Sequence, residues 1–159
     1  MTPQPSIRPT RIQTLVAIAV ATAMLSWAVV RGWYGDIPPF QWFMPIGIGL
    51  VAAGELFGGR VLKRRLEGID GAPPPDPLVA ARVVVLGKAS AYLGAGLSGM
   101  WAGAAVYPAS QWGYLLTAKT DTVVAVVGVV LSVALTCTGL WLESITRIRT
   151  GDDDNRGPK

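Results

Sequence analysis

Histidine is absent from this chain, and cysteine occurs once, as Cys137. Without histidine the protein cannot build a histidine-ligated zinc site, a Ser-His-Asp triad or a Cys-His dyad. A single cysteine also excludes a disulfide within the chain. The sequence therefore offers no catalytic residue, no cofactor site and no metal site, and we expect that the protein is not an enzyme.

Charge is also scarce. Charged residues make up 15% of the 159 residues and apolar residues 51%, whereas soluble domains carry roughly 25% charged residues. The net charge of +4 could suggest a nucleic-acid partner. However, the basic residues flank long apolar runs, and this arrangement is typical of a membrane protein. We therefore expect the lipid bilayer as a partner and no nucleic acid.

Four apolar segments are long enough to cross a bilayer, because a hydrocarbon core of ~30 Å requires ~20 helical residues. Their residues do not alternate between apolar and polar, as the strands of a barrel would. In lipid the backbone must satisfy its own hydrogen bonds, so these segments must be helices. The sequence predicts an all-α fold, an integral membrane four-helix bundle. The predicted spans are residues 12–30, 41–59, 79–107 and 123–142.

The remaining segments complete the predicted organisation. Residues 1–11 form a cytoplasmic N-terminal segment, and 12–149 form the transmembrane domain with a Pro-rich cytoplasmic linker at 60–78. Residues 150–159 are expected to be a disordered cytoplasmic tail. Ala21-Thr22-Ala23 would also suit cleavage of a signal peptide. The apolar run continues past this point, which favours an uncleaved anchor.

Lysine and arginine gather on the side that carries both termini and the linker. The opposite side carries only Arg31 and Lys119. The positive-inside rule then places both termini in the cytoplasm of a multi-pass protein of the plasma (inner) membrane. Most tryptophans fall near the opposite, outer ends of the spans, where they are typical of an interfacial belt.

Two ionisable residues lie clearly inside the spans, Glu55 and Lys88. A charge at the bilayer centre costs ~2.5–3.5 kcal/mol on insertion scales. Both residues are expected at similar depth on the cytoplasmic side, so they form a candidate intramembrane ion pair between consecutive helices. The pair would either lock two helices, which we favour, or form a polar site for an ion or substrate. Glu143 and Arg147 have the spacing of an ordinary interfacial pair.

The third span carries a candidate helix-packing face of small residues that recur every four positions: Ala91, Ala95, Gly99 and Gly103. Gly54-x-x-x-Gly58 repeats the spacing in the second span. Small residues allow helix backbones to approach closely in lipid. The face would serve either packing inside the bundle, which we favour, or a homo-oligomer interface.

A basic cluster follows the second span and consists of Arg60, Lys63, Arg64 and Arg65. Basic residues beside a membrane surface attract anionic lipid by up to ~1 kcal/mol each. We therefore expect this cluster to contact lipid headgroups on the cytoplasmic side.

Several segments together resemble one known family. They are Pro9-Thr10-Arg11, Trp33-Tyr34, Glu55, Asp76-Pro77-Leu78 before Ala80-Ala81-Arg82, Lys88-Ala89-Ser90, and Trp141-Leu142-Glu143. The chain resembles, over nearly its whole length, the actinobacterial membrane family catalogued as domain of unknown function 3180. This resemblance implies a small four-helix inner-membrane protein, often encoded near folate-synthesis genes. It implies no activity and transfers no functional residue.

Two functions fit these observations. The leading hypothesis is a non-catalytic interaction or structural protein that packs against a membrane-protein partner, or against itself as a homo-oligomer, through the third span or the basic linker. The alternative is a small oligomeric transporter or channel subunit that uses Glu55 and Lys88. If the pair is structural, replacing both residues with apolar ones should be tolerated better than replacing either alone.

Overall fold

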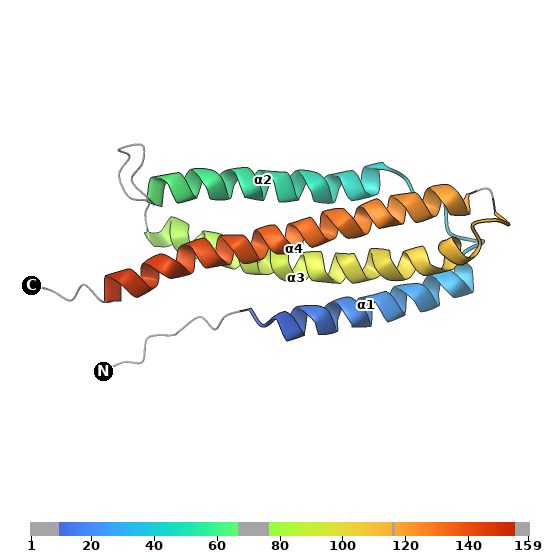
Figure 1. The fold of residues 1–159 in the computed structure, drawn as a ribbon, viewed down its shortest axis with the longest axis horizontal. Helices are drawn as coiled ribbons and strands as arrows, with labels where there is room; N and C mark the ends of the chain where they lie inside the picture. Colours follow the sequence, from blue (N-terminus) through green and yellow to red (C-terminus); the bar gives the residue numbers. More distant parts are fainter. Residues whose placement is uncertain (1–9, 67–76, 116, 155–159) are drawn as a thin grey trace, which may run out of the picture.

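The computed structural model describes residues 10–66, 77–115 and 117–154, and within them it contains four helices and no strand (Figure 1). The helices are α1 (Ile12–Trp33), α2 (Phe43–Leu66), α3 (Pro77–Ser110) and α4 (Ala118–Asp154). All four are long and apolar enough to cross a membrane. The predicted all-α fold is confirmed, and the four helices agree with the predicted membrane bundle.

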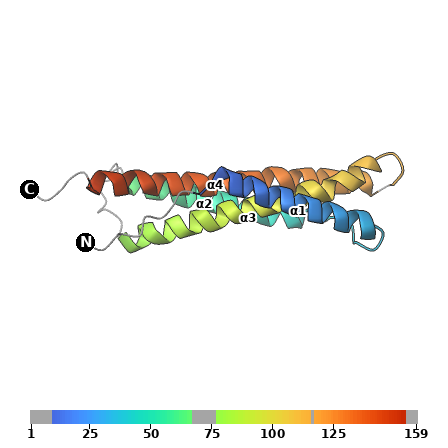
Figure 2. The same ribbon diagram turned by 90° about the horizontal axis from the view of Figure 1, so that it is seen from below.

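The helices pack in the spatial order α1, α3, α4, α2, which differs from their order along the chain (Figure 1 and Figure 2). α3 packs along both α1 and α4, and α2 packs along α4. We expected α2 and α3 to be direct neighbours because consecutive antiparallel helices usually are. Among the described residues, however, no Cα atom of α2 lies within 8 Å of one in α3.

Small residues explain why α4, and not α2, lies directly beside α3. A Cβ added at Gly87 would lie 2.8 Å from the carbonyl oxygen of Gly139. One added at Gly94 would lie 2.7 Å from the backbone nitrogen of Thr136. In lipid the hydrophobic effect does not drive helices together, so close backbone packing of this kind has to stabilise the pair.

The buried core is small and lies mainly along α3 and α4. Its residues include Ala91, Ala95, Val124, Leu135 and Leu142. Large apolar side chains instead point outward, and Leu25, Leu50 and Leu93 are each more than half exposed. An apolar surface of this extent is rare on monomeric soluble proteins. It is what the hydrocarbon of a bilayer would solvate.

Two helices extend beyond the predicted boundaries. α2 continues to Leu66, so the basic cluster forms its last turns and does not belong to a linker. α4 continues to Asp154, so residues 150–154 are helical although we expected a disordered tail from residue 150. No proline interrupts α4, and its hydrogen-bond ladder can therefore continue into the polar sequence. Residues 1–9, 67–76, 116 and 155–159 lie outside the described residues.

We call the two ends of the bundle the basic end and the aromatic end. The basic end carries the end of α2 with its basic cluster and the start of α3, whereas α1 begins some way short of it (Figure 1). The aromatic end carries the connections between α1 and α2 and between α3 and α4, with Trp33, Trp42 and Trp112 beside them. This segregation is the physical basis of any orientation in a membrane.

Candidate functional site

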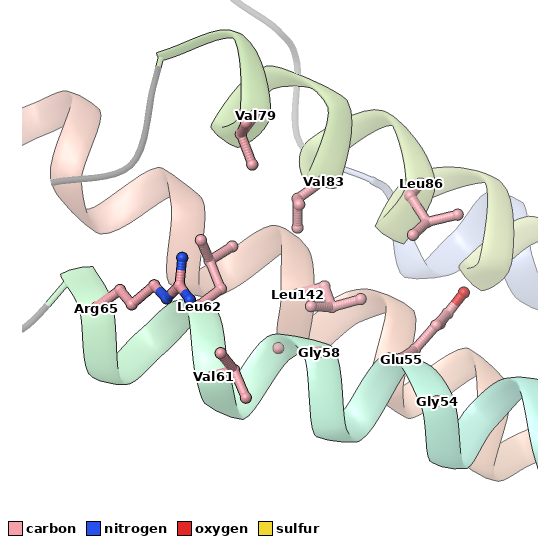
Figure 3. Close-up of a pocket in the computed structure, with 11 residues that line it drawn as sticks. Gly54, Glu55, Gly58, Val61, Leu62, Arg65, Val79, Val83, Leu86 and Leu142 are labelled. Atoms are coloured by element: carbon pink, nitrogen blue, oxygen red, sulfur yellow. The ribbon is translucent and has the colours of Figure 1, made fainter. Parts of the chain in front are cut away.

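A groove separates α2 from α3 in the half of the bundle nearest the basic end (Figure 3). It encloses about 480 Å³, within the ~300–1,000 Å³ range of ligand pockets. Its walls are Gly54, Glu55, Gly58 and Arg65 of α2 and Val79, Val83 and Leu86 of α3, with Leu142 of α4 between them. We call this feature the α2–α3 groove. It exists because α2 packs on α4 and leaves α3 uncovered here.

Glu55 provides the acidic group of the groove. Its Oε1 accepts a hydrogen bond from the hydroxyl of Ser90 on α3. Its Oε2 is buried and has no hydrogen-bond partner among the described residues. Figure 3 shows the side chain reaching across the groove towards Leu86, at the opposite end from Arg65. A buried carboxyl oxygen without a partner is costly, so a group that enters the groove and bonds to it would be stabilised.

Lys88 is half-buried on α3, and the contacts that the structure shows for Glu55 do not include it. The helix geometry gives the reason. Lys88 precedes Ser90 by two residues, and side chains at that spacing do not share a helix face. Lys88 and Ser90 therefore start from different faces of α3. Glu55 thus has a hydroxyl partner on α3, and its ion pair with Lys88 stays a prediction.

All four residues of the candidate packing face are buried inside the bundle: Ala91, Ala95, Gly99 and Gly103. Gly99 and Gly103 lie directly against the backbone of α1. A Cβ added at Gly99 would lie 2.0 Å from the carbonyl oxygen of Ala19, and one at Gly103 would lie 2.1 Å from that of Ala23. This Gly-x-x-x-Gly pair is therefore occupied by a helix of the same chain.

The second pair, Gly54 and Gly58, is not used in this way. A Cβ added at either glycine would have no heavy atom of another part of the fold within 4 Å. Gly59 makes the close contact of α2 instead, against Trp141 and Leu142 of α4. Gly54 and Gly58 consequently leave the α2 backbone open along the groove, next to Glu55.

The basic cluster lies on the last turns of α2, and its side chains are exposed: Arg60, Lys63, Arg64 and Arg65. Arg65 also lines the groove. It follows Glu55 by ten residues, or ~15 Å of helix. The groove therefore runs from a buried carboxyl group inside the bundle to a guanidinium group at the basic end.

Asp121 has a role that the sequence analysis did not identify. It lies in the first turn of α4, is 3% exposed, and accepts two hydrogen bonds. The Tyr34 hydroxyl donates to Oδ2 at 2.6 Å, and the Phe40 backbone N–H donates to Oδ1 at 2.8 Å. An acid in a first helical turn is favoured by the helix dipole. That position was the available signal, but it does not reveal the partners, which lie 81 and 87 residues earlier.

Glu143, towards the basic end of α4, likewise accepts two hydrogen bonds, and it is 6% exposed. The backbone N–H of Thr10 donates to its Oε1 at 3.1 Å, and the Thr10 hydroxyl donates to its Oε2 at 2.5 Å. The side chain of Arg147, which we had paired with Glu143, lies outside the described residues. The two acids of α4 stand ~33 Å apart. Through these hydrogen bonds α4 holds the residues at both ends of α1, although α1 and α4 do not pack along their length.

Tyr34 allows a test of the contact at the aromatic end. Burial and the hydrogen bond to the Asp121 carboxylate raise the pKa of Tyr34 from 10.0 to about 12. A raised tyrosine pKa stabilises the fold fully below pH 10, and this stabilisation is lost as the pH rises through about 12. We expect a tyrosinate absorbance titration to contain a late step that disappears in Tyr34→Phe. A late step that persisted in this variant would contradict the assignment.

No three His, Cys, Asp or Glu side chains of the described residues come together as a metal-binding group. Cys137 is exposed on α4. Among the described residues, a half-buried acid, a hydroxyl group and two glycines come together at the α2–α3 groove.

Comparison with known proteins finds a family model but no individual relative. No curated protein and no solved structure matches the chain. Residues 15–150 match the model of one family, described as a protein of unknown function (DUF3180). The match spans all four helices and includes the groove and both acids of α4. The chain therefore belongs to the DUF3180 family.

Proposed function

We propose that this protein is a non-catalytic membrane protein that binds a transmembrane helix of another protein in its α2–α3 groove. The observation that carries the proposal is the combination of an open glycine pair with a buried carboxyl oxygen that has no partner. Helices associate in lipid through close packing at small residues and through hydrogen bonds between helices. The groove offers both on one helix face.

The surroundings of Glu55 define the partner that would fit. Its Oε2 requires a hydrogen-bond donor, since Ser90 already serves Oε1. A helix that lies on Gly54 and Gly58 would bring its own side chains to the depth of Glu55. The partner helix should therefore carry a donor there, such as a hydroxyl, an amide or a basic side chain. The valines and leucines of the groove would pack against its apolar residues.

The small-residue face of α3 is a weaker candidate for this role. Gly99 and Gly103 are already covered by α1. A partner could reach them only by displacing α1, which would also break the contacts of Glu143 and Asp121 at its two ends. This cost favours the groove over α3 as the binding face.

We also propose that the basic end faces the cytoplasm of a cell-membrane protein. The proposal is supported by the basic cluster at one end of the bundle and by Arg11 at the end of α1 that faces this side. The aromatic end carries Arg31 and Lys119. The cluster would then meet the anionic lipids of the cytoplasmic leaflet, at ~1 kcal/mol per basic residue near the surface.

The groove can be tested by crosslinking in cells, followed by purification of the full chain and mass spectrometry of what accompanies it. We expect one reproducible partner with the wild type and its loss in Gly58→Leu, because the leucine would fill the groove. Gly58→Leu should still fold, since no atom lies within 4 Å of the new Cβ. Ala53→Leu is the matched control, because Ala53 is exposed on α2 and does not line the groove.

The other outcomes are equally informative. Capture that is unchanged in Gly58→Leu would exclude the groove as the binding face. Recovery of the chain with itself alone would replace the partner by a second copy. If no complex forms and Glu55→Gln abolishes movement of an ion or solute across vesicles, the alternative of an oligomeric transporter or channel subunit would be supported instead.

A further inference from the structure

A second pocket lies on the other half of the bundle, between α1, α2 and α3. It encloses about 560 Å³, and no charged residue lines it. The residues used below are Ser26 and Val30 of α1, Phe40 before α2, Met44 of α2, and Leu97 and Trp101 of α3. We call this feature the Trp101 pocket. It shares no lining residue with the α2–α3 groove.

Trp101 forms an apolar wall that carries one polar atom. The side chain is 6% exposed and packs edge-on against Phe40, with ring centroids 5.8 Å apart and planes at 89°. Gly128 of α4 lies under the ring, where a Cβ would meet it at 2.4 Å. The indole Nε1 is buried and has no acceptor among the described residues. An indole nitrogen can only donate a hydrogen bond.

Ser26 adds a second donor to the same pocket. Many hydroxyls within these spans bond to a carbonyl oxygen one turn earlier, as Thr22 does to Ile18 and Ser132 does to Gly128. The Ser26 hydroxyl makes no hydrogen bond with the described part of the chain, although its residue is half-buried. Ser26 and Trp101, whose side chains each carry a neutral donor, therefore both line one apolar pocket, and the indole Nε1 lies beneath its surface.

We propose that the Trp101 pocket binds a neutral lipid through a carbonyl oxygen. The donors select an acceptor, and the apolar walls select a hydrocarbon body. A phosphate is disfavoured because no basic residue lines the pocket. The depth of the pocket also disfavours a charged ligand, since Ser26 lies ~10 Å along α1 from the end of this helix at Trp33. A charged headgroup at that depth would be costly, whereas a ketone, quinone or ester carbonyl would be accommodated.

The test uses the full chain in micelles and two probes of similar chain length, methyl palmitate and octadecane. Both fit an apolar pocket, but only the ester carries a carbonyl acceptor. We expect methyl palmitate, and not octadecane, to move the indole N–H resonance of Trp101 downfield in a ¹⁵N–¹H spectrum. The resonance is identified by its absence in Trp101→Phe, a variant that keeps a ring against Gly128.

Affinity gives the second readout. Ser26→Ala should weaken methyl palmitate binding about two- to tenfold, the range for loss of one neutral hydrogen bond. Trp112→Phe is the matched control, because Trp112 is 46% exposed and does not line the pocket. It should leave both the shift and the affinity unchanged. An unmoved Trp101 resonance, or equal shifts with both probes, would overturn the proposal whether or not the α2–α3 groove binds a partner.

Discussion

Gly99→Ala is expected to lower the free energy of unfolding by roughly 3 kcal/mol or more, at the upper end of the usual cost of overpacking. The new Cβ would lie 2.0 Å from the carbonyl oxygen of Ala19 and 2.2 Å from the hydroxyl oxygen of Thr22. Because the first of these atoms is backbone, a side-chain rotation cannot relieve the clash. α1 itself would have to move away from α3.

The measurement is reversible unfolding in mixed micelles with a rising mole fraction of dodecyl sulfate, followed by circular dichroism. Gly54→Ala is the matched control, since it places the same substitution in the same motif with no heavy atom within 4 Å. It should leave stability unchanged or raise it slightly, because alanine is the better helix former. Equal stability of the two variants would show that α1 does not pack on Gly99.

Combining Gly99→Ala with Gly103→Ala should cost less than the two separate losses together. Both glycines face the same helix, and a Cβ at Gly103 would lie 2.1 Å from the carbonyl oxygen of Ala23. Once α1 has moved away to relieve the first clash, the second is partly relieved as well. Substitutions that share a partner are not additive for this reason.

Asp121→Ala is the second large effect, with an expected loss of roughly 3 kcal/mol, because a hydrogen bond to a charged group contributes about 1.5–3 kcal/mol. The carboxylate accepts from both the Tyr34 hydroxyl and the Phe40 backbone N–H. Its removal would leave the Phe40 donor without this partner and release the α1–α2 connection from α4. The same micelle titration measures the loss.

Asp36→Ala provides the control, since Asp36 is an exposed acid in the same connection. It should change stability by less than about 0.5 kcal/mol. A double-mutant cycle of Asp121→Asn with Tyr34→Phe should give a coupling energy of about 0.5–3 kcal/mol. If Asp121→Ala and Asp36→Ala were indistinguishable, the proposed role of Asp121 in holding the α1–α2 connection to α4 would be refuted.

The predictable part of this fold is the part that depends on local sequence. A bilayer requires ~20 apolar residues and complete internal hydrogen bonding from each crossing segment. Each requirement can be checked within one window of sequence, so all four helices were found. The ends of the helices were predicted less accurately than their existence. The basic cluster and residues 150–154 both continue a helix, and neither segment contains a proline that would interrupt it.

The candidate site was predictable only in part. Glu55 stood out because an acidic side chain within a membrane span is costly and is therefore rarely present without a role. It does line the groove. Its partner Ser90 lies 35 residues away in the chain, and nothing in the sequence indicates that the two side chains meet. Asp121 was missed for a related reason. Its two donors come from the α1–α2 connection, which reaches it only after the helices assemble.

The sequence by itself determined that this chain forms four apolar helices, with most basic residues towards one end and most tryptophans towards the other. Tertiary structure decided which of two similar glycine pairs is covered. Gly99 and Gly103 meet the backbone of α1, whereas Gly54 and Gly58 are left open because α2 contacts α4 through Gly59. The physical reason is that close packing needs complementary small surfaces on both helices. A motif on one helix cannot show whether its counterpart is present.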